Sequence, residues 1–281
     1  MPKISRRKFL GGGGILLASL LVPLAPARAA VANLNDAINK AGRLRMLSQR
    51  MAKTYCQLGQ DILVPQSRRI LEASMKLYQE HLDELKAYAP QEDIRATYAE
   101  LEGVWRRYRQ LLSGSPSLEN ARQISRINED ALRLAHLGTT QLELLATSSV
   151  GRLVNIAGRQ RMLSQRLAKF YMFQRWGISV AGMDAEAETA RREFLSAMDA
   201  LERAPENTAK IRNELELARM QWVFFDQALR QQKAGVKDPT YAANVATTSE
   251  RILEVMDRVA TLYAQLNPAG PAETPPRPGR R

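Results

Sequence analysis

The sequence predicts an all-α protein built from two tandem up-down four-helix bundles. Three features favour this fold. Apolar residues recur at alternating spacings of four and three along most of the chain, which is typical of helices that pack in left-handed bundles. Short segments rich in glycine, proline or serine interrupt this pattern at regular intervals. A stretch of 13 residues also occurs twice, which indicates an internal duplication.

Residues 1–30 are predicted to be a twin-arginine signal peptide. Arg6 and Arg7 precede an apolar, glycine-rich run, and "APARAA" offers small residues for cleavage near Ala29 or Ala30. The apolar run spans about 14 residues, whereas a membrane-spanning helix needs about 20, so an uncleaved anchor is the less favoured interpretation. We therefore expect an exported, periplasmic protein.

Charge and cysteine content narrow the function classes. Five of the 41 lysines and arginines lie in the signal, which leaves a net charge of +7 on the mature chain. This excess of positive charge is modest and distributed along the chain, so it favours small anions over nucleic acid as partners. Cys56 is the only cysteine, so no internal disulfide can form, and it is expected to be a small packing residue.

Breakers divide the mature chain into eight helices, four in each copy. Short loops join them, so consecutive helices are expected to be antiparallel neighbours. The first bundle is expected to span residues 31–150 and the second 151–267, and the Pro-rich basic tail at 268–281 is expected to be disordered. The predicted helices span residues 33–59, 66–88, 91–113, 117–148, 151–176, 182–204, 206–234 and 239–266.

The duplication extends over the whole four-helix unit, because residues far from the repeated stretch also match. The offset between copies grows only from 116 to 121 residues, as small loop changes would produce. Trp105 and Trp222 lie at equivalent positions on apolar seams, so both are expected to be core residues rather than parts of a cofactor site. The matched residues are Arg45 with Arg161, Trp105 with Trp222, Glu129 with Glu250, and Leu132 with Leu253.

The repeated stretch itself reads "AGRLRMLSQRMAK" at 41–53 and "AGRQRMLSQRLAK" at 157–169, and 11 of its 13 positions are identical. We call these two segments the boxes. On a helix, the leucines and methionines of the first box fall on the side that faces its bundle core. The opposite side carries the same polar set in both copies. This set is Gly42, Arg45, Gln49 and Lys53 in the first box and Gly158, Arg161, Gln165 and Lys169 in the second, with Arg50 and Arg166 alongside.

Core packing does not require this outward side to be identical in both copies. Glycine lets another backbone approach closely, and an arginine one turn later presents a planar fork of donors suited to an oxyanion. The glutamine adds neutral donors. The sequence therefore predicts ligand binding by Gly42, Arg45, Gln49 and their counterparts, with Arg50, Lys53, Arg166 and Lys169 as possible secondary contacts. Two alternatives remain open: solvated charges with internal ion pairs, and slow divergence of the two copies.

The boxes, read as "NKAGRLRMLSQRMAK" and "NIAGRQRMLSQRLAK", resemble a known family of periplasmic four-helix sensor domains. They are similar to the ligand-box helix of nitrate/nitrite sensor kinases (NarX-like). They are equally similar to the N-terminal domain of type IV pilus methyl-accepting chemotaxis transducers (PilJ-like). The resemblance implies that Arg45 and Arg161 contact nitrate or nitrite between two first helices. It also implies flanking transmembrane helices and a signalling module, which this sequence does not show, so we expect a membrane-bound sensor or envelope protein as partner.

Two arrangements of the bundles are possible. If the chain turns back near Gly151, the first helix of each unit runs parallel to the other and Arg45 faces Arg161 within one chain, as an internal pseudo-dimer. If the helix continues through Gly151, the bundles stack end to end and each box needs a partner in a second molecule. "TSSVG" is a weak breaker, and it slightly favours the turn.

Enzyme motifs are missing. Neither His81 nor His136 belongs to a Glu-x-x-His pair, and the sequence has no haem, zincin or phosphate-loop motif. We expect no cofactor, no metal and no catalysis, and we expect each histidine to be an exposed or capping helix residue. The contrasting hypothesis is a ligand-free adaptor whose box face docks a helix of another protein.

Overall fold

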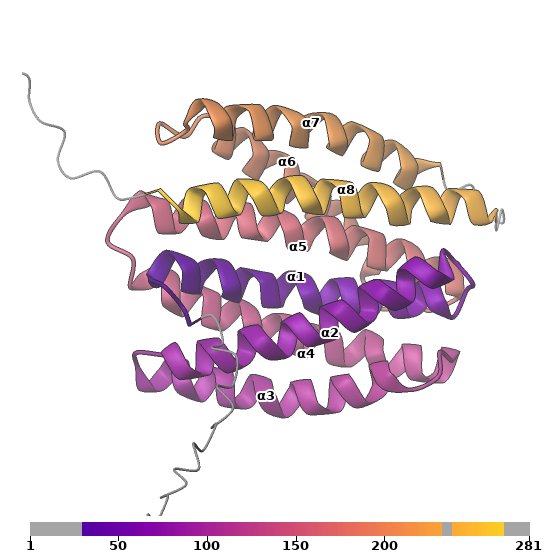
Figure 1. Ribbon diagram of the computed structural model, residues 1–281. Helices are drawn as coiled ribbons and strands as arrows, with labels where there is room; N and C mark the ends of the chain where they lie inside the picture. The colour runs from indigo at the N-terminus through magenta and orange to yellow at the C-terminus, as the bar shows by residue number, and fades with distance from the viewer. Residues whose placement is uncertain (1–29, 232–237, 267–281) are drawn as a thin grey trace, which may run out of the picture.

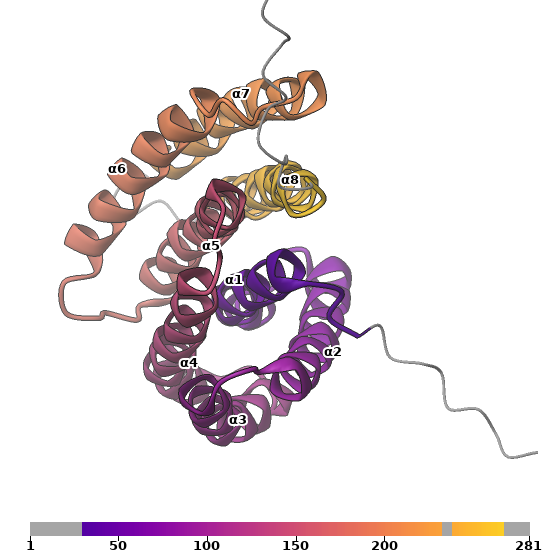
Figure 2. The same cartoon turned by 90° about the vertical axis from the view of Figure 1, so that its left-hand side faces the viewer.

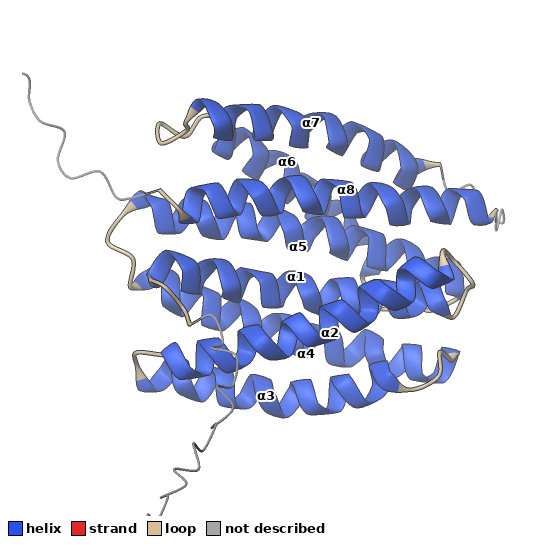
Figure 3. Ribbon diagram, viewed as in Figure 1, coloured by secondary structure: helices blue, strands red, loops and turns tan. Residues whose placement is uncertain are grey.

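The computed structural model describes residues 30–231 and 238–266. These residues form eight helices and no strand, which confirms the all-α fold (Figure 3). The predicted tail and all but the last residue of the predicted signal peptide lie outside the described residues. The helices are α1 (Leu34–Leu58), α2 (Val64–Tyr88), α3 (Glu92–Ser113), α4 (Leu118–Leu144), α5 (Ser149–Trp176), α6 (Met183–Glu202), α7 (Ala209–Arg230) and α8 (Pro239–Ala264).

The helices form two antiparallel groups of four, α1–α4 and α5–α8, which lie side by side (Figure 1). The chain turns back between Leu144 and Ser149, so α5 runs parallel to α1 and the continuous-helix alternative is wrong. The expected break at Gly151 is misplaced, because that glycine lies in the first turn of α5 and packs against the turn itself. A Cβ built on Gly151 would lie 2.6 Å from the Cβ of Ala146.

Each group has its own aromatic core, as the apolar seams predict. Trp105 stacks on Tyr78 with 4.3 Å between ring centroids, and Trp222 stacks on Phe194 at 4.1 Å. Both tryptophans are buried, which confirms them as core residues, and Cys56 is buried as expected.

Helices α1 and α5 pack against each other at the centre of the molecule. Figure 2 shows them between the α2–α3 hairpin and the α6–α7 hairpin, with α4 and α8 beside them. They meet closely at Gly42 and Gly158, where a Cβ built on either glycine would lie 3.7 Å from the Cα of the other. The same Cβ would lie 3.2 Å from Nη2 of Arg161 and 3.3 Å from Nη2 of Arg45. Only glycine leaves room here for both guanidinium groups.

This close packing can be tested by Gly42→Leu. The larger side chain must displace two guanidinium groups and separate the helices, so we expect the free energy of unfolding to fall by about 2 kcal/mol or more. Urea unfolding followed by circular dichroism measures this change. The control is Gly103→Ala in α3, where an added Cβ meets nothing within 4 Å. It should raise stability by about 0.5–1 kcal/mol, and equal effects of the two substitutions would contradict the packing described.

Candidate functional site

The polar side of each box lies inside the molecule. As predicted, this side faces away from the core of its own bundle. It is not exposed to solvent, however, because the other box packs against it. The charges on this side are therefore not solvated, although the ion pairs that the same alternative expects are present. The side chains that are 0% exposed are those of Arg45, Gln49, Lys53, Arg161, Gln165 and Lys169.

The two box arginines make reciprocal hydrogen bonds across the α1–α5 contact. Nη2 of Arg45 donates to the side-chain oxygen of Asn155 at 2.7 Å and to its carbonyl at 3.3 Å. Nη2 of Arg161 donates to the same two oxygens of Asn39, at 2.9 and 3.2 Å. The arrangement has an approximate twofold axis, so Arg45, Arg161, Gly42 and Gly158 come together as one layer. We call it the arginine layer.

Sequence reasoning missed the two asparagines. Asn39 and Asn155 each precede their glycine by three residues, so the duplicated Asn-x-x-Gly was a usable signal. Their role depends on the close pairing of two helices, which a helical projection of one helix does not reveal.

Two turns further along, the lysines and the neighbouring arginines tie the groups together through ion pairs. Lys53 and Arg50 of α1 both bind Glu250 of α8, in the other group. Lys169 and Arg166 of α5 both bind Glu129 of α4. The four candidate secondary ligands are thus engaged in structural ion pairs.

These ion pairs are strongly coupled. Burial would raise the pKa of Glu250, but Lys53 and Arg50 outweigh it and lower that pKa to about 2. Burial lowers the pKa of Lys169 to about 8, although the carboxylate of Glu129 opposes this shift. A buried cation next to a buried anion keeps both groups charged at neutral pH.

The glutamines of the boxes bridge helices within the same interface. Nε2 of Gln165 donates to the carbonyl of Ser249 at 2.9 Å, and its Oε1 accepts from Lys53 at 2.7 Å. Nε2 of Gln49 donates to the side-chain oxygen of Asn128 at 3.2 Å, while Oε1 of Gln49 has no hydrogen-bond partner. Both glutamines lie beyond the arginine layer and contact the lysine level rather than the guanidinium groups.

The twofold symmetry breaks beside the arginine layer. Arg161 donates through Nη1 to Asp257 of α8, whose carboxylate also accepts from Arg43 at 2.8 and 3.0 Å. Burial would raise the pKa of Asp257, but the two arginines lower it to about 2. In the duplicated sequence the counterpart of Asp257, at the offset of 121 that pairs Glu129 with Glu250, is His136.

Arg45 therefore has a histidine where Arg161 has a carboxylate. Its Nη1 lies 3.3 Å from Nδ1 of His136 and, being a cation, must donate to it. Among the described residues no carboxylate lies within ion-pair distance of Arg45, whereas Nε has no hydrogen-bond partner in either Arg45 or Arg161. Burial, with smaller contributions from Arg159 and Arg161, lowers the pKa of Arg45 to about 9, although the carboxylate of Glu143, which accepts from Asn155, opposes this shift. Partial burial together with the cations of Arg45 and Arg159 lowers the pKa of His136 to about 4, so the imidazole is neutral at pH 7.

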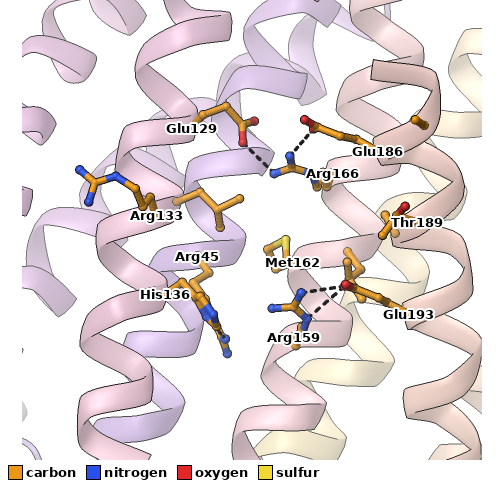
Figure 4. A pocket seen from close by; sticks show the side chains of 14 residues that line it. Arg45, Glu129, Arg133, His136, Arg159, Met162, Arg166, Glu186, Thr189 and Glu193 are labelled. Carbon is orange, nitrogen blue, oxygen red and sulfur yellow. Dashed lines mark hydrogen bonds and ion pairs between the residues drawn. The ribbon is translucent and has the colours of Figure 1, made fainter. Parts of the chain in front are cut away.

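A pocket of about 460 Å³ opens beside Arg45 and His136. It lies between α4, α5 and α6, and Arg45 of α1 reaches it from behind (Figure 4). Ion pairs of Arg159 with Glu193, and of Arg166 with Glu129 and Glu186, form part of its walls. The remaining lining residues are Leu132, Arg133, His136, Met162, Leu163, Ala185, Thr189 and Ala190.

The histidines differ from each other in environment. His136 is exposed at this pocket, in line with expectation, but His81 is buried and its Nδ1 lies 3.3 Å from Glu84. The expectation that His81 would be exposed or capping is wrong because α1 covers that side of α2 and brings Lys40 to the same Glu84.

The family model of the type IV pili methyl-accepting chemotaxis transducer N-terminal domain (PilJ) matches residues 30–129 and again 146–248. The chain belongs to the PilJ family. No curated protein and no solved structure gives a significant match. Each PilJ match begins shortly before a box helix, so the two boxes hold equivalent places in a tandem pair of PilJ domains.

Within residues 30–231 and 238–266, no helix is long and apolar enough to span a membrane. Over the same ranges, no group of three or more His, Cys, Asp or Glu side chains is placed to hold a metal ion.

The ion pairs between the two groups of helices should make the free energy of unfolding depend on pH in the acid range. The pKa of Glu250 is about 2 in the folded protein and about 4.3 in an unfolded chain. The ion pairs of Glu250 thus stabilise the fold above about pH 4.3, and this contribution is lost as the pH falls toward 2. We expect Glu250→Gln to cost about 3–5 kcal/mol at pH 7, because two cations lose their partner. It should also flatten the fall in stability below pH 4.3.

Urea unfolding at several pH values measures both effects. The control is Glu100→Gln, since Glu100 pairs with Arg133 on the surface, where both side chains are about 60% exposed. It should change stability little. If Glu250→Gln behaves like this control, the ion pairs are not what holds the two PilJ domains together.

Proposed function

We propose that this tandem PilJ protein is a periplasmic sensory module that binds a small oxyanion, nitrate or nitrite by resemblance, at its arginine layer. One observation carries the proposal: Arg45 is fully buried, has no carboxylate partner among the described residues, and leaves Nε without a hydrogen bond. A buried cation is costly unless an anion accompanies it. A planar oxyanion would supply both the charge and the missing acceptor.

Each box residue has a distinct role in this proposal. Arg45 is the principal ligand, and Arg161 is the second guanidinium of the same layer. Gly42 and Gly158 allow the helices to approach closely enough for both. Gln49 and Gln165 line the next turn, where Oε1 of Gln49 has no hydrogen-bond partner. Arg50, Lys53, Arg166 and Lys169 hold the layer in place through their ion pairs.

Binding at this site would be sensed through domain geometry. The arginine layer lies where the two PilJ domains touch, so an anion that draws the guanidinium groups together favours one spacing of α1 and α5 over another. A membrane-bound sensor or envelope protein would read this change. We also propose that the protein is exported by the twin-arginine route. It would act as a monomer in which the two boxes form an internal pseudo-dimer. No catalytic step is included, since the family is one of chemotaxis transducer domains.

The contrasting function is a ligand-free adaptor. Docking of a partner's helix on the box face is excluded by the burial of that face. An adaptor would have to use another surface, and the exposed apolar residues of α7 are the clearest choice. They are Met220, Val223 and Phe224, each at least 50% exposed.

Thermal unfolding with added nitrate, nitrite and chloride separates the two functions. A ligand at 100 times its Kd stabilises the fold by about 2.7 kcal/mol, which raises Tm by roughly 5–10 °C for a chain of this size. We expect such a rise with nitrate or nitrite and its loss in Arg45→Ala. The matched control is Arg107→Ala, which removes an exposed arginine of α3 and should keep the response. If no anion raises Tm and Arg45→Ala behaves as wild type, the adaptor function is correct.

A further inference from the structure

We propose that the pocket between α4, α5 and α6 binds a small organic monocarboxylate, whose carboxylate lies beside His136 and Arg159 and supplies the negative charge that Asp257 supplies in the other half of the molecule. This inference rests on the proposed function in one respect: Arg45 is the buried cation that the anion balances in both. It adds the location of the site, its chemical class and its stoichiometry of one per chain.

The internal symmetry supplies the first argument. On one side of the arginine layer, the Asp257 carboxylate lies between Arg161 and Arg43. The symmetry-related side has Arg45 and Arg159, and α4 places His136 there instead of an aspartate. Asp257 thus pairs with both arginines on one side, whereas on the other side Arg159 pairs with Glu193 and Arg45 has no carboxylate within ion-pair distance among the described residues.

The equivalence of the two sides is supported by contacts about two turns away along α4 and α8. Lys53 donates to Ser249 and Glu250 of α8, while Lys169 donates to the matching Asn128 and Glu129 of α4. The same offset therefore places His136 at the position of Asp257.

The local charges favour a single negative charge on the ligand. Arg159 already has Glu193 at 2.7 Å, but Arg45 has no acidic partner among the described residues. Further carboxylates, those of Glu129 and Glu186, lie on the walls and are bound by Arg166. They would repel a second carboxylate on the ligand.

The size and lining of the pocket favour an organic ligand. Its volume of about 460 Å³ lies in the range of small-molecule sites and far exceeds the volume of nitrate or nitrite. Next to the arginines the wall is apolar and would cover an alkyl or aryl group. The apolar residues are Leu132, Met162, Leu163, Ala185 and Ala190.

His136 provides a hydrogen-bond donor for the ligand carboxylate. Because Nδ1 accepts from Arg45, the neutral ring carries its proton on Nε2. That N–H can donate to a carboxylate oxygen at the pocket. The groups that face the imidazole are Arg45 from α1, Arg159 from α5 and Glu193 from α6.

Isothermal titration of the purified chain with pentanoate tests the inference. We expect one site per chain, with at least tenfold weaker binding of the neutral analogue pentanamide and of the dicarboxylate glutarate. The decisive variant is His136→Asp, which builds the missing carboxylate into α4. It should abolish pentanoate binding and raise the Tm of the ligand-free protein. The matched control is Leu137→Asp, which adds the same charge at an exposed neighbouring position of α4 and should keep binding.

Arg159→Gln provides a second variant that leaves Arg45 and the arginine layer intact, and it should weaken pentanoate binding by about tenfold or more. The inference is overturned if pentanoate does not bind, or if it binds His136→Asp as tightly as wild type. Nitrate in a parallel titration separates this inference from the proposed function. Nitrate binding without pentanoate binding refutes the organic ligand alone, pentanoate binding without nitrate binding refutes the oxyanion alone, and absence of both refutes both.

Discussion

Two arginine side chains are buried where α1 and α5 touch, and much of the structure serves to accommodate them. A guanidinium group removed from water needs acceptors and a counter-charge, or it destabilises the fold. Glycines at the contact provide space, and asparagines from the opposite helix provide acceptors. The counter-charge is supplied to Arg161 by Asp257, while Arg45 receives a neutral histidine. This single asymmetry turns a symmetric structural contact into a candidate binding site.

The ion pairs around the layer explain how a local event could reach the whole molecule. Cations of α1 bind Glu250 in the second group of helices, α5–α8, and cations of α5 bind Glu129 in the first group, α1–α4. The two groups of helices are therefore joined by exchanged ion-pair partners as well as by apolar contacts such as that of Tyr55 with Trp176. A change in charge at Arg45 acts directly on the surface along which the two domains are held, and coupling of this kind needs no long path through either core.

Sequence reasoning reached the fold because helical periodicity is a local property. The seams that contain Trp105 and Trp222 predicted two cores, and both are present. The sequence singles out the box arginines, but it does not predict their burial, because a projection of one helix cannot show that its outward side meets a second copy of itself. The equivalence of His136 and Asp257 could have been predicted from the sequence, since the offset of 121 residues also relates Glu129 to Glu250. The pocket could not have been predicted, because it depends on the distance between α6 and α4.

On one side of the arginine layer Asp257 pairs with Arg161, whereas on the other side no carboxylate among the described residues lies within ion-pair distance of Arg45. Bromide provides a direct test, because a crystal of the chain grown or soaked in bromide shows bound halide by anomalous diffraction. We expect an anomalous peak within hydrogen-bond distance of the Arg45 guanidinium, on the side of His136, and none beside Arg161, where Asp257 is in place. Equal peaks beside both arginines, or a peak beside Arg161 alone, would contradict this account.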